Sequence, residues 1–425
     1  MSVTTTIKPQ TTSPAATSDG DSKPFRPAPF AEANQQFLVG ETLYLRALEP
    51  GDGQHPTVWR DSPYPINTDK AEELIKKEIE KPGPGKTVRL LACRRVDDQP
   101  VGVATYSTWN WLNGDASVYA DPAYGDAAGA YRAEMLGLIV PWLLDERDLM
   151  VVWVNVAGND RALIEAAGAI GMHQATCLRE AYWLNGRRED WLTFEGLNRG
   201  WEAKLGRPEA GITVGCAPDD PRRRFEGAPS AIFRHPAGDP PKDALMVGDR
   251  IFLRAYTPDD ARRESTWGRQ ESETFFDNGR GLHSAHGLER WNRKHMDDDP
   301  AGWVRFAIVL KETGEFIGSN GIADIDWVHK TAETESFIPN TAYRGGGYGS
   351  EAKHLLLAYS FERLGLHTVR SYVWGPNTRS QAALRKQGYR DAGRFHWTGL
   401  KNAEWTHDMS FDLLADEWRE RIGGR

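Results

Sequence analysis

The chain carries an internal duplication, and this limits its architecture more than any other feature of the sequence. Three blocks recur in the same order in the two halves, with residues such as Gly, Leu, Arg and Trp at matching positions. The matched blocks are 40–52 with 248–260, 88–111 with 304–327, and 194–201 with 411–418. One such match could arise by chance, but three in one order indicate two copies of one fold. Each copy has about 170 residues, which is typical of a single domain.

The repeats predict four segments. We expect a disordered tail at 1–36, a first domain at 37–205, a linker at 206–246 and a second domain at 247–425. The tail is rich in Thr, Ser and Pro, and it lacks the charged start and apolar block of a secretory signal. The linker is dense in Pro, Gly and charge. Its three arginines at 222–224 fit a solvated linker, with an anion or RNA contact as the alternative.

The composition excludes several classes of protein. Hydrophobic residues make up 40% of the chain and charged residues 26%, as in folded soluble proteins rather than disordered or fibrous ones. No apolar run approaches the roughly 20 residues that cross a bilayer. A formal net charge of -8 disfavours a polyanion as the main partner. Because Cys93, Cys177 and Cys216 are few and far apart, we expect no disulfide framework, no CxxC metal site and a cytoplasmic location.

Within each half, short apolar strands alternate with helical patterns, which predicts an α/β fold with a mixed sheet. In the second half, 304–310 and 316–327 should form a hairpin. A strand through Glu335 and Phe337 should follow, then a glycine loop, a helix, a further strand and helix, and a final strand pair. The closing helix is expected at 413–422.

The glycine loop is the motif that points to chemistry. Arg344 is followed by four glycines within five residues, and then by a helix whose apolar residues fall at i, i+3, i+4 and i+7. Glycines can adopt positive φ, so backbone N–H groups can converge on an anion at the helix start. The loop lacks the Gly-Lys-Ser/Thr of a Walker A motif and the spacing of a dinucleotide fingerprint. We therefore predict a phosphate-binding loop outside those two classes, with a plain strand–helix turn as the alternative.

The loop resembles the R-x-x-G-x-G/A motif of the GNAT superfamily of N-acyltransferases, in which it binds the pyrophosphate of acyl-coenzyme A. The segment 374–395 is similar to the N-x-x-S motif and the later G-F/Y of the branch that contains ribosomal-protein N-terminal acetyltransferases. The opening and closing blocks of this half resemble the same branch. The resemblance implies two tandem GNAT-like domains, each a mixed, mostly antiparallel twisted sheet with a central splayed pair of parallel strands and flanking helices.

The resemblance also implies a site for acyl-coenzyme A, in the first instance acetyl-coenzyme A, in the wedge between the splayed strands. The strand end would contact the thioester and pantetheine arm, and the loop would hold the pyrophosphate. Asn377, at an expected helix N-cap, would bind the pantetheine side. The residues expected to bind the cofactor are Phe337, Ile338, Arg344, Gly345, Gly346, Gly347, Tyr348, Gly349, Ser350 and Asn377.

Acyl transfer to an amine requires a neutral nucleophile and a thiolate that can leave, and it requires no metal. We expect direct attack in a ternary complex, with Glu335 as general base because it shares the strand face of Phe337. Glu333 competes for this role, and either carboxylate could instead face solvent. The resemblance suggests Ser380 as proton donor to the sulfur, with a helix-cap hydroxyl as the alternative. No metal site is predicted, because the histidines of this region form no HxxxH or HxH pair beside a carboxylate.

The first half departs from the motif. Asp126 lies in its loop and Arg132 replaces a glycine, while Asn159 is retained and Ala162 stands at the position of Ser380. A loop carboxylate would repel phosphate. We therefore expect a degenerate domain that packs against the catalytic one and shapes the acceptor site.

The resemblance therefore implies an acyl-CoA-dependent N-acyltransferase whose second half is catalytic. Its acceptor would be a small-molecule or peptide amine, and no membrane partner is expected. Two alternatives stay open. One is an aminoacyl-tRNA-dependent transferase of the same fold, which would need a basic surface. The other is a non-catalytic acyl-CoA-binding scaffold.

Overall fold

A computed structural model describes residues 36–59, 66–80, 87–108, 112–208, 241–266, 284–296, 299–401 and 403–422. Within these residues, sixteen strands form one mixed sheet flanked by helices, so the prediction of an α/β fold with a mixed sheet is confirmed. The expected tail, most of the linker and its three arginines lie outside the described residues. None of the described helices is long and apolar enough to span a membrane.

The sheet has the same order of strands on both sides of its centre. From the outer edge inward, the first half contributes β1-β2-β3-β4-β5-β6-β8-β7 and the second half β9-β10-β11-β12-β13-β14-β16-β15. The strands of the first half are β1 (Leu38–Val39), β2 (Leu43–Ala47), β3 (Val88–Arg94), β4 (Pro100–Thr108), β5 (Asn113–Ala120), β6 (Val151–Ala157), β7 (His173–Leu184) and β8 (Arg187–Leu197). Those of the second half are β9 (Met246–Val247), β10 (Ile251–Ala255), β11 (Val304–Leu310), β12 (Phe316–Asp326), β13 (Thr331–Phe337), β14 (Thr368–Trp374), β15 (Arg390–Lys401) and β16 (Glu404–Leu414).

In each half one strand pair is parallel, β5 with β6 and β13 with β14, and the other neighbours are antiparallel. The helices of the first half are α1 (Thr68–Glu80), α2 (Ala127–Pro141), α3 (Arg161–Ala169) and α4 (Arg199–Leu205). Those of the second half are α5 (Pro258–Thr266), α6 (Ala285–Met296), α7 (Tyr348–Ala358), α8 (Thr378–Gln387) and α9 (Ala415–Arg421). The predicted hairpin at 304–327 is therefore confirmed as β11 and β12.

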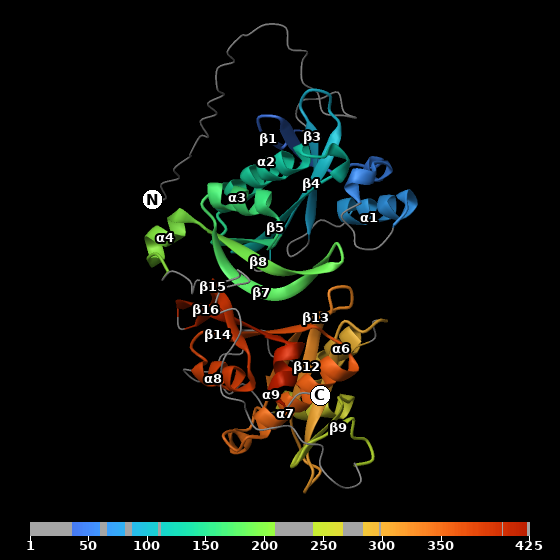
Figure 1. Cartoon of the computed structure of the whole chain (residues 1–425), viewed down its shortest axis with the longest axis vertical. Helices are drawn as coiled ribbons and strands as arrows, with labels where there is room; N and C mark the ends of the chain where they lie inside the picture. Colours follow the sequence, from blue (N-terminus) through green and yellow to red (C-terminus); the bar gives the residue numbers. More distant parts are fainter. Residues whose placement is uncertain are drawn as a thin grey trace, which may run out of the picture.

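The halves meet where β7 lies beside β15, at the green-to-red boundary of Figure 1. Gly393 of β15 pairs with Thr176 of β7. Gly393 has φ +134°, and a Cβ there would lie 2.2 Å from the carbonyl oxygen of Ala175. Only glycine allows so close a backbone approach, so this residue sets how tightly the two strands join.

Each half has a core of its own. In the second half, α7 buries Ala352, Leu355 and Leu356 against the sheet, and in the first half α2 buries Met135 and Ile139. Two smaller clusters mix side chains from both halves. They contain Trp153 with Trp397, and Leu178 with Ala392.

Two expectations differ from the structure. The closing helix begins at Ala415, not at Leu413, because Leu413 and Leu414 pair with β14 and are buried in the last strand. Sheet packing outweighs the helical propensity of these leucines. Of the described cysteines, Cys93 is a buried free thiol, whereas Cys177 is disulfide-bonded, which the spacing of the cysteines did not predict.

Candidate active site

The parallel strands β13 and β14 separate along their length. They pair only from Thr331 to Glu333 on β13 and from Thr368 to Arg370 on β14. Beyond that point β13 stays paired with β12 as far as Phe337, and β14 stays paired with β16 as far as Trp374. The two strands therefore follow different neighbours and leave a wedge at their carboxyl ends.

The two glutamates considered as general base lie at different heights of this wedge. Glu333 belongs to the last paired position, opposite Arg370. Glu335 lies beyond that position, where β13 is paired with β12 and no longer with β14. Its partner on β12 is Gly321. A Cβ on Gly321 would lie 2.8 Å from Glu335 Oε1 and 3.1 Å from Trp303 Nε1, so the missing side chain makes room for this carboxylate beside the indole. Glu335 is thus the carboxylate at the open part of the wedge.

A buried lysine lies behind these carboxylates. Lys353 of α7 is 4% exposed, and its Nζ lies 5.8 Å from the ring centroid of Tyr389. Burial lowers the pKa of Lys353 to about 7, and the carboxylates of Glu335 and Glu333 partly oppose this change. Lys353 was not among the site residues predicted from the sequence. The sequence did contain an indication of its burial. Lys353 follows Ala352 and lies four residues before Leu357, which places it on the edge of the apolar face of the helix.

The glycine loop joins the end of β13 to α7. Gly345 and Gly347 have φ values of +83° and +87°, in the left-handed region that glycine adopts at low cost. Gly347 is the N-cap of α7, so no N-cap side chain caps the N–H groups of the first helical turn. Gly346, Tyr348, Gly349 and Ser350 lie at this same helix start. Such a start is a suitable site for an anion.

Two arginines hold the loop in place. Arg344, predicted to bind pyrophosphate, donates hydrogen bonds of 2.8 Å from Nε to the Ile338 carbonyl and from Nη2 to the Pro339 carbonyl. It therefore ties the loop to the end of β13 in this structure. Arg250, which sequence reasoning missed, donates to the carbonyl of Gly346 over 2.6 Å. It also pairs with Glu351 of α7 at 3.0 Å, and its guanidinium lies 4.6 Å from the Tyr348 ring.

The opposite side of the wedge is the start of α8. Asn377 is the N-cap of this helix, as predicted, and its Oδ1 accepts a hydrogen bond from the N–H of Ser380 over 3.2 Å. Ser380 lies half-buried in the first turn. Phe337 and Ile338 lie across the wedge, at the last residue of β13 and just after it. The structure thus brings the predicted residues of β13, the loop and α8 around one opening.

The first half has a different arrangement at the same place. Its helix α2 already begins at Ala127, so helix occupies the positions that form the glycine loop in the second half. Arg132 of α2 forms an ion pair with Asp160, the N-cap of α3, with 3.0 Å between Nη2 and Oδ1. Asp160, rather than Asn159, therefore occupies the place of Asn377, and Leu163 rather than Ala162 that of Ser380. This ion pair links α2 to α3 across the opening.

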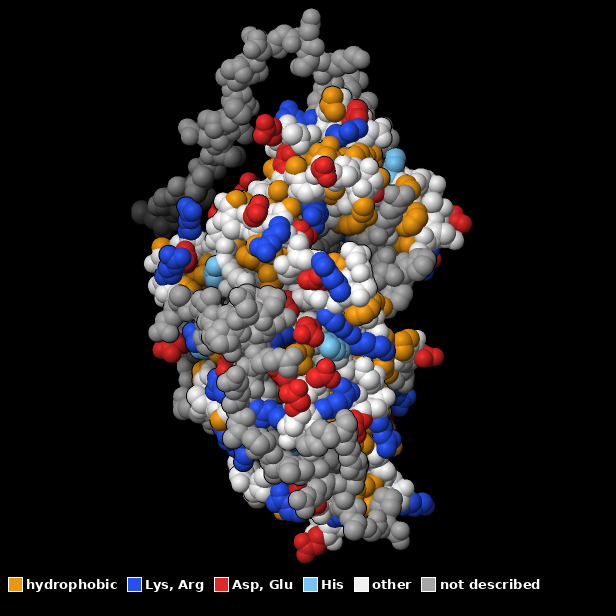
Figure 2. Space-filling view, viewed as in Figure 1, with side chains coloured by type: hydrophobic (Ala, Val, Ile, Leu, Met, Phe, Trp, Pro, Cys, Tyr) orange, Lys and Arg blue, Asp and Glu red, His pale blue; other side chains and the backbone are white. Residues whose placement is uncertain are grey.

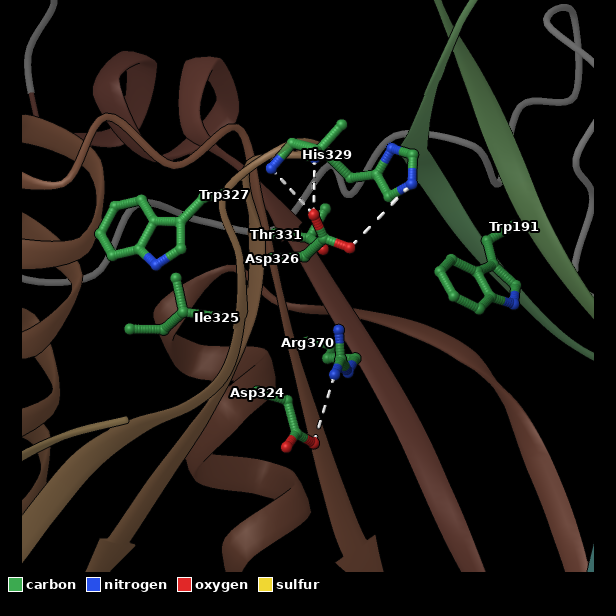
Figure 3. A pocket seen from close by; sticks show the side chains of 9 residues that line it. Trp191, Asp324, Ile325, Asp326, Trp327, His329, Thr331 and Arg370 are labelled. Carbon is green, nitrogen blue, oxygen red and sulfur yellow. Dashed lines mark hydrogen bonds and ion pairs between the residues drawn. The ribbon is translucent and has the colours of Figure 1, made fainter. Parts of the chain in front are cut away.

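A pocket of about 350 Å³ adjoins the paired base of the wedge (Figure 3). Arg370 and Asp324 face one another across it at 3.5 Å, and Asp326 accepts hydrogen bonds from the N–H groups of Val328 and His329. Trp191 enters from β8 of the first half. The pocket is thus lined by both halves, with carboxylates and indoles among its walls.

Comparison with known proteins finds similarity over part of the chain. The family described as "Acetyltransferase (GNAT) domain" matches residues 250–390. The uncharacterized N-acetyltransferase YnaD of Bacillus subtilis (strain 168) is 28% identical over 122 residues, covering 27% of this chain and 66% of YnaD. The uncharacterized N-acetyltransferase p20 of Bacillus licheniformis is 34% identical over 89 residues, covering 21% of this chain and 49% of p20. The chain therefore spans less than two thirds of either relative.

Solved structures that match part of this chain include spermidine N-acetyltransferase from Vibrio cholerae in complex with CoA and spermine. It is 20% identical, with a TM-score of 0.35, and the match covers 40% of this chain and 98% of that one. A chimera of SpeG from Vibrio cholerae and hSSAT is 21% identical with a TM-score of 0.37, covering 40% and 98%.

Proposed function

We propose that the GNAT acetyltransferase domain matched at 250–390 makes this chain an acyl-CoA-dependent N-acyltransferase, with acetyl-CoA as the first candidate donor. The observation that carries the proposal is the wedge between β13 and β14, which opens beside the glycine-capped start of α7. We assign catalysis to a domain at 247–425 and a structural role to a degenerate GNAT-like domain at 37–205.

The residues around the wedge fit acyl-coenzyme A. Two positive-φ glycines and an uncapped first turn suit a pyrophosphate, and the half-buried Phe337 and Ile338 suit the pantetheine arm. Asn377 would approach the pantetheine from α8. When bound, the cofactor supplies an acyl thioester and a leaving thiolate. The first half lacks this fit, because the Arg132–Asp160 ion pair spans the corresponding opening.

In the proposed reaction, Glu335 removes a proton from the acceptor ammonium and leaves a neutral amine. The amine nitrogen forms a bond to the thioester carbonyl carbon, and the carbon–sulfur bond breaks. Ser380 gives its hydroxyl proton to the sulfur and takes up the proton that the nitrogen loses as it becomes an amide, so the products are the amide and free coenzyme A. Placement of the amine can supply roughly 7–11 kcal/mol, and a general base about 10²–10⁴-fold. We therefore expect a ternary complex without an acyl-enzyme, so ping-pong kinetics would contradict the mechanism.

A small amine is the acceptor that this surface supports best. The pocket beside the wedge holds Asp324, which pairs with Arg370 at 3.5 Å, and Asp326, whose carboxylate would attract a cation. The rings of Trp191 and Trp327 could stack on such a cation. Trp191 would be the contribution of the first half. An aminoacyl-tRNA would require a basic surface, whereas blue and red side chains are interspersed on the face in Figure 2.

The test is a coenzyme A release assay with the purified chain, acetyl-CoA and a panel of amines. We expect Glu335→Gln to lower kcat by about 10²–10⁴-fold with unchanged CoA affinity by calorimetry. The exposed Glu312→Gln variant is the matched control and should retain full activity. An equal loss in Glu333→Gln alone would move the base to that residue. No CoA binding would refute the function, and two equivalent CoA sites per chain would refute the degenerate first half.

A further inference from the structure

Three residues from three adjacent strands converge where the halves meet. His173 is the first residue of β7 and lies directly opposite Glu195 of β8. His396 lies on β15, three residues beyond Gly393, which pairs with β7. One ligand atom from each of the three side chains lies within 4.8 Å of the other two. The group includes none of the residues assigned to acyl transfer.

The carboxylate of Glu195 is at the centre of this group and is 0% exposed. Its Oε1 accepts hydrogen bonds of 3.0 Å from Trp153 Nε1 and from the backbone N–H of His396. Its Oε2 lies 2.5 Å from His396 Nδ1 and 3.2 Å from His173 Nε2. Oε1 is therefore held by two N–H donors, and Oε2 lies close to one nitrogen of each imidazole ring.

A second cluster shows what is unusual about the first. Each of the three positions has an equivalent in the other half of the repeat. His173 corresponds to Arg390, Glu195 to Asp412 and His396 to Arg179. There Asp412 lies 2.7 Å from a guanidinium nitrogen of each arginine. Guanidinium groups can only donate hydrogen bonds and cannot bind a metal. Imidazole nitrogens and a carboxylate oxygen are, in contrast, common zinc ligands.

We propose that His173, Glu195 and His396 form a zinc site that joins the two halves of the sheet. The donor set of two histidines and one glutamate suits Zn²⁺. The side chain of His173 is 42% exposed, so ions have a route to the site and water can fill the fourth position. Binding would place the metal beside Oε2 and the two imidazole nitrogens that face it.

The sequence could not reveal this group. Its members are separated by 22 and 201 positions, so they form no spaced motif, and no metal site was predicted from the sequence. Only the pairing of β7 with β15 brings His396 to the other two. The site would therefore exist only while the halves are joined, and a bound metal would stabilise that junction.

The experiment uses the full-length, tag-free chain, stripped with a chelator and titrated with ZnCl₂ by calorimetry. We expect one zinc per chain and a melting temperature that rises with zinc concentration. His173→Ala should weaken binding by more than the roughly 10–100-fold that a partner outside the coordination shell contributes. This variant removes a partly exposed side chain and should fold. The exposed His286→Ala on α6 is the matched control and should bind as the parent does.

Glu195→Gln serves as a second variant, because it keeps the size of the side chain and removes the charged ligand. Cobalt substitution gives an independent readout, with visible bands of tetrahedral intensity expected in the parent and lost in both variants. Zinc that binds equally well to the parent and to His173→Ala would overturn the proposal. So would a stripped chain that takes up no zinc. None of these outcomes depends on acyltransferase activity.

Discussion

Lys353 is a lysine in an apolar environment, because its amine is buried between α7, β13 and the ring of Tyr389. Burial lowers its pKa to about 7, against 10.5 for an ordinary lysine. Between these two pH values the unfolded chain binds a proton that the folded chain does not bind. The free energy of unfolding therefore rises with pH across this window, and the full penalty is present below it.

This sign gives a testable pH dependence. From about pH 6 to about pH 9, Lys353 should add on the order of 3 kcal/mol to the free energy of unfolding. Lys353→Met should abolish that part of the slope and stabilise the chain at the lower pH. The measurement is urea unfolding of both proteins at the two pH values, with the exposed Lys386→Met as control. Equal slopes in the parent and Lys353→Met would show that the amine is not buried as described.

At the scale of the element, the start of α7 depends on two left-handed glycines and on the side chains that hold them. Arg344 ties the loop to β13, and Arg250 ties it to Glu351 and thus to α7 itself. A Cβ at Gly347 would lie 3.0 Å from Arg250 Nη2. The conformation that exposes the N–H groups would therefore be strained for any residue other than glycine. Contacts of Arg344 on one side and of Arg250 on the other stabilise it.

Gly347→Ala should weaken coenzyme A binding by about 5–30-fold. The left-handed conformation costs a non-glycine residue roughly 1–2 kcal/mol, so the loop of the variant adopts another conformation. Coenzyme A binding must then restore the left-handed conformation at that cost. Calorimetry with CoA measures the effect. Gly314→Ala is a matched control, because Gly314 has φ +67° and open space around it in the β11–β12 turn. It should lose stability but keep its CoA affinity, and equal affinities in both variants would argue against a cofactor role for the loop.

For the whole molecule, the junction between the halves is held by charges as well as by strand pairing. Arg179 of β7 is 0% exposed and bonds to Asp412 and Glu417 of the second half at 2.7 and 2.6 Å. Arg390 completes the network on the other side of Asp412. Because these charges are buried, the cost of removing each one from water is offset only by its interactions with the oppositely charged partners. Loss of one of these charges should therefore cost more stability than loss of a charge in a surface ion pair.

Arg179→Met should destabilise the chain by about 3–5 kcal/mol, because it leaves two carboxylates buried without their shared cation. The exposed Arg187, which pairs with Glu189 at the tip of the β7–β8 hairpin, provides the control. Arg187→Met should leave the urea midpoint unchanged, since exposed ion pairs contribute little. A similarly small effect in Arg179→Met would mean that the network does not hold the junction.

Much of this architecture is readable in the amino-acid order, because it depends on local pattern. The repeated blocks predicted a repeated order of elements, and the apolar periods predicted the β11–β12 hairpin and the helix after the loop. Asn377 was recognisable as an N-cap because Gly375 and Pro376 precede it. The glycine run marked the start of α7 since glycine alone adopts those φ values freely.

Other features depend on contacts between residues far apart in the chain, which no local pattern encodes. Lys353 is buried because α7 packs across the sheet, and Arg344 turns to the carbonyls of Ile338 and Pro339 because the loop folds back on the end of β13. Leu413 and Leu414 are strand residues because β14 lies beside them. The joining of β7 to β15 brings Arg179 to Asp412 and His396 to Glu195. Local order thus specifies the elements, whereas packing across the sheet and between the halves specifies which side chains become neighbours and how each one ionises.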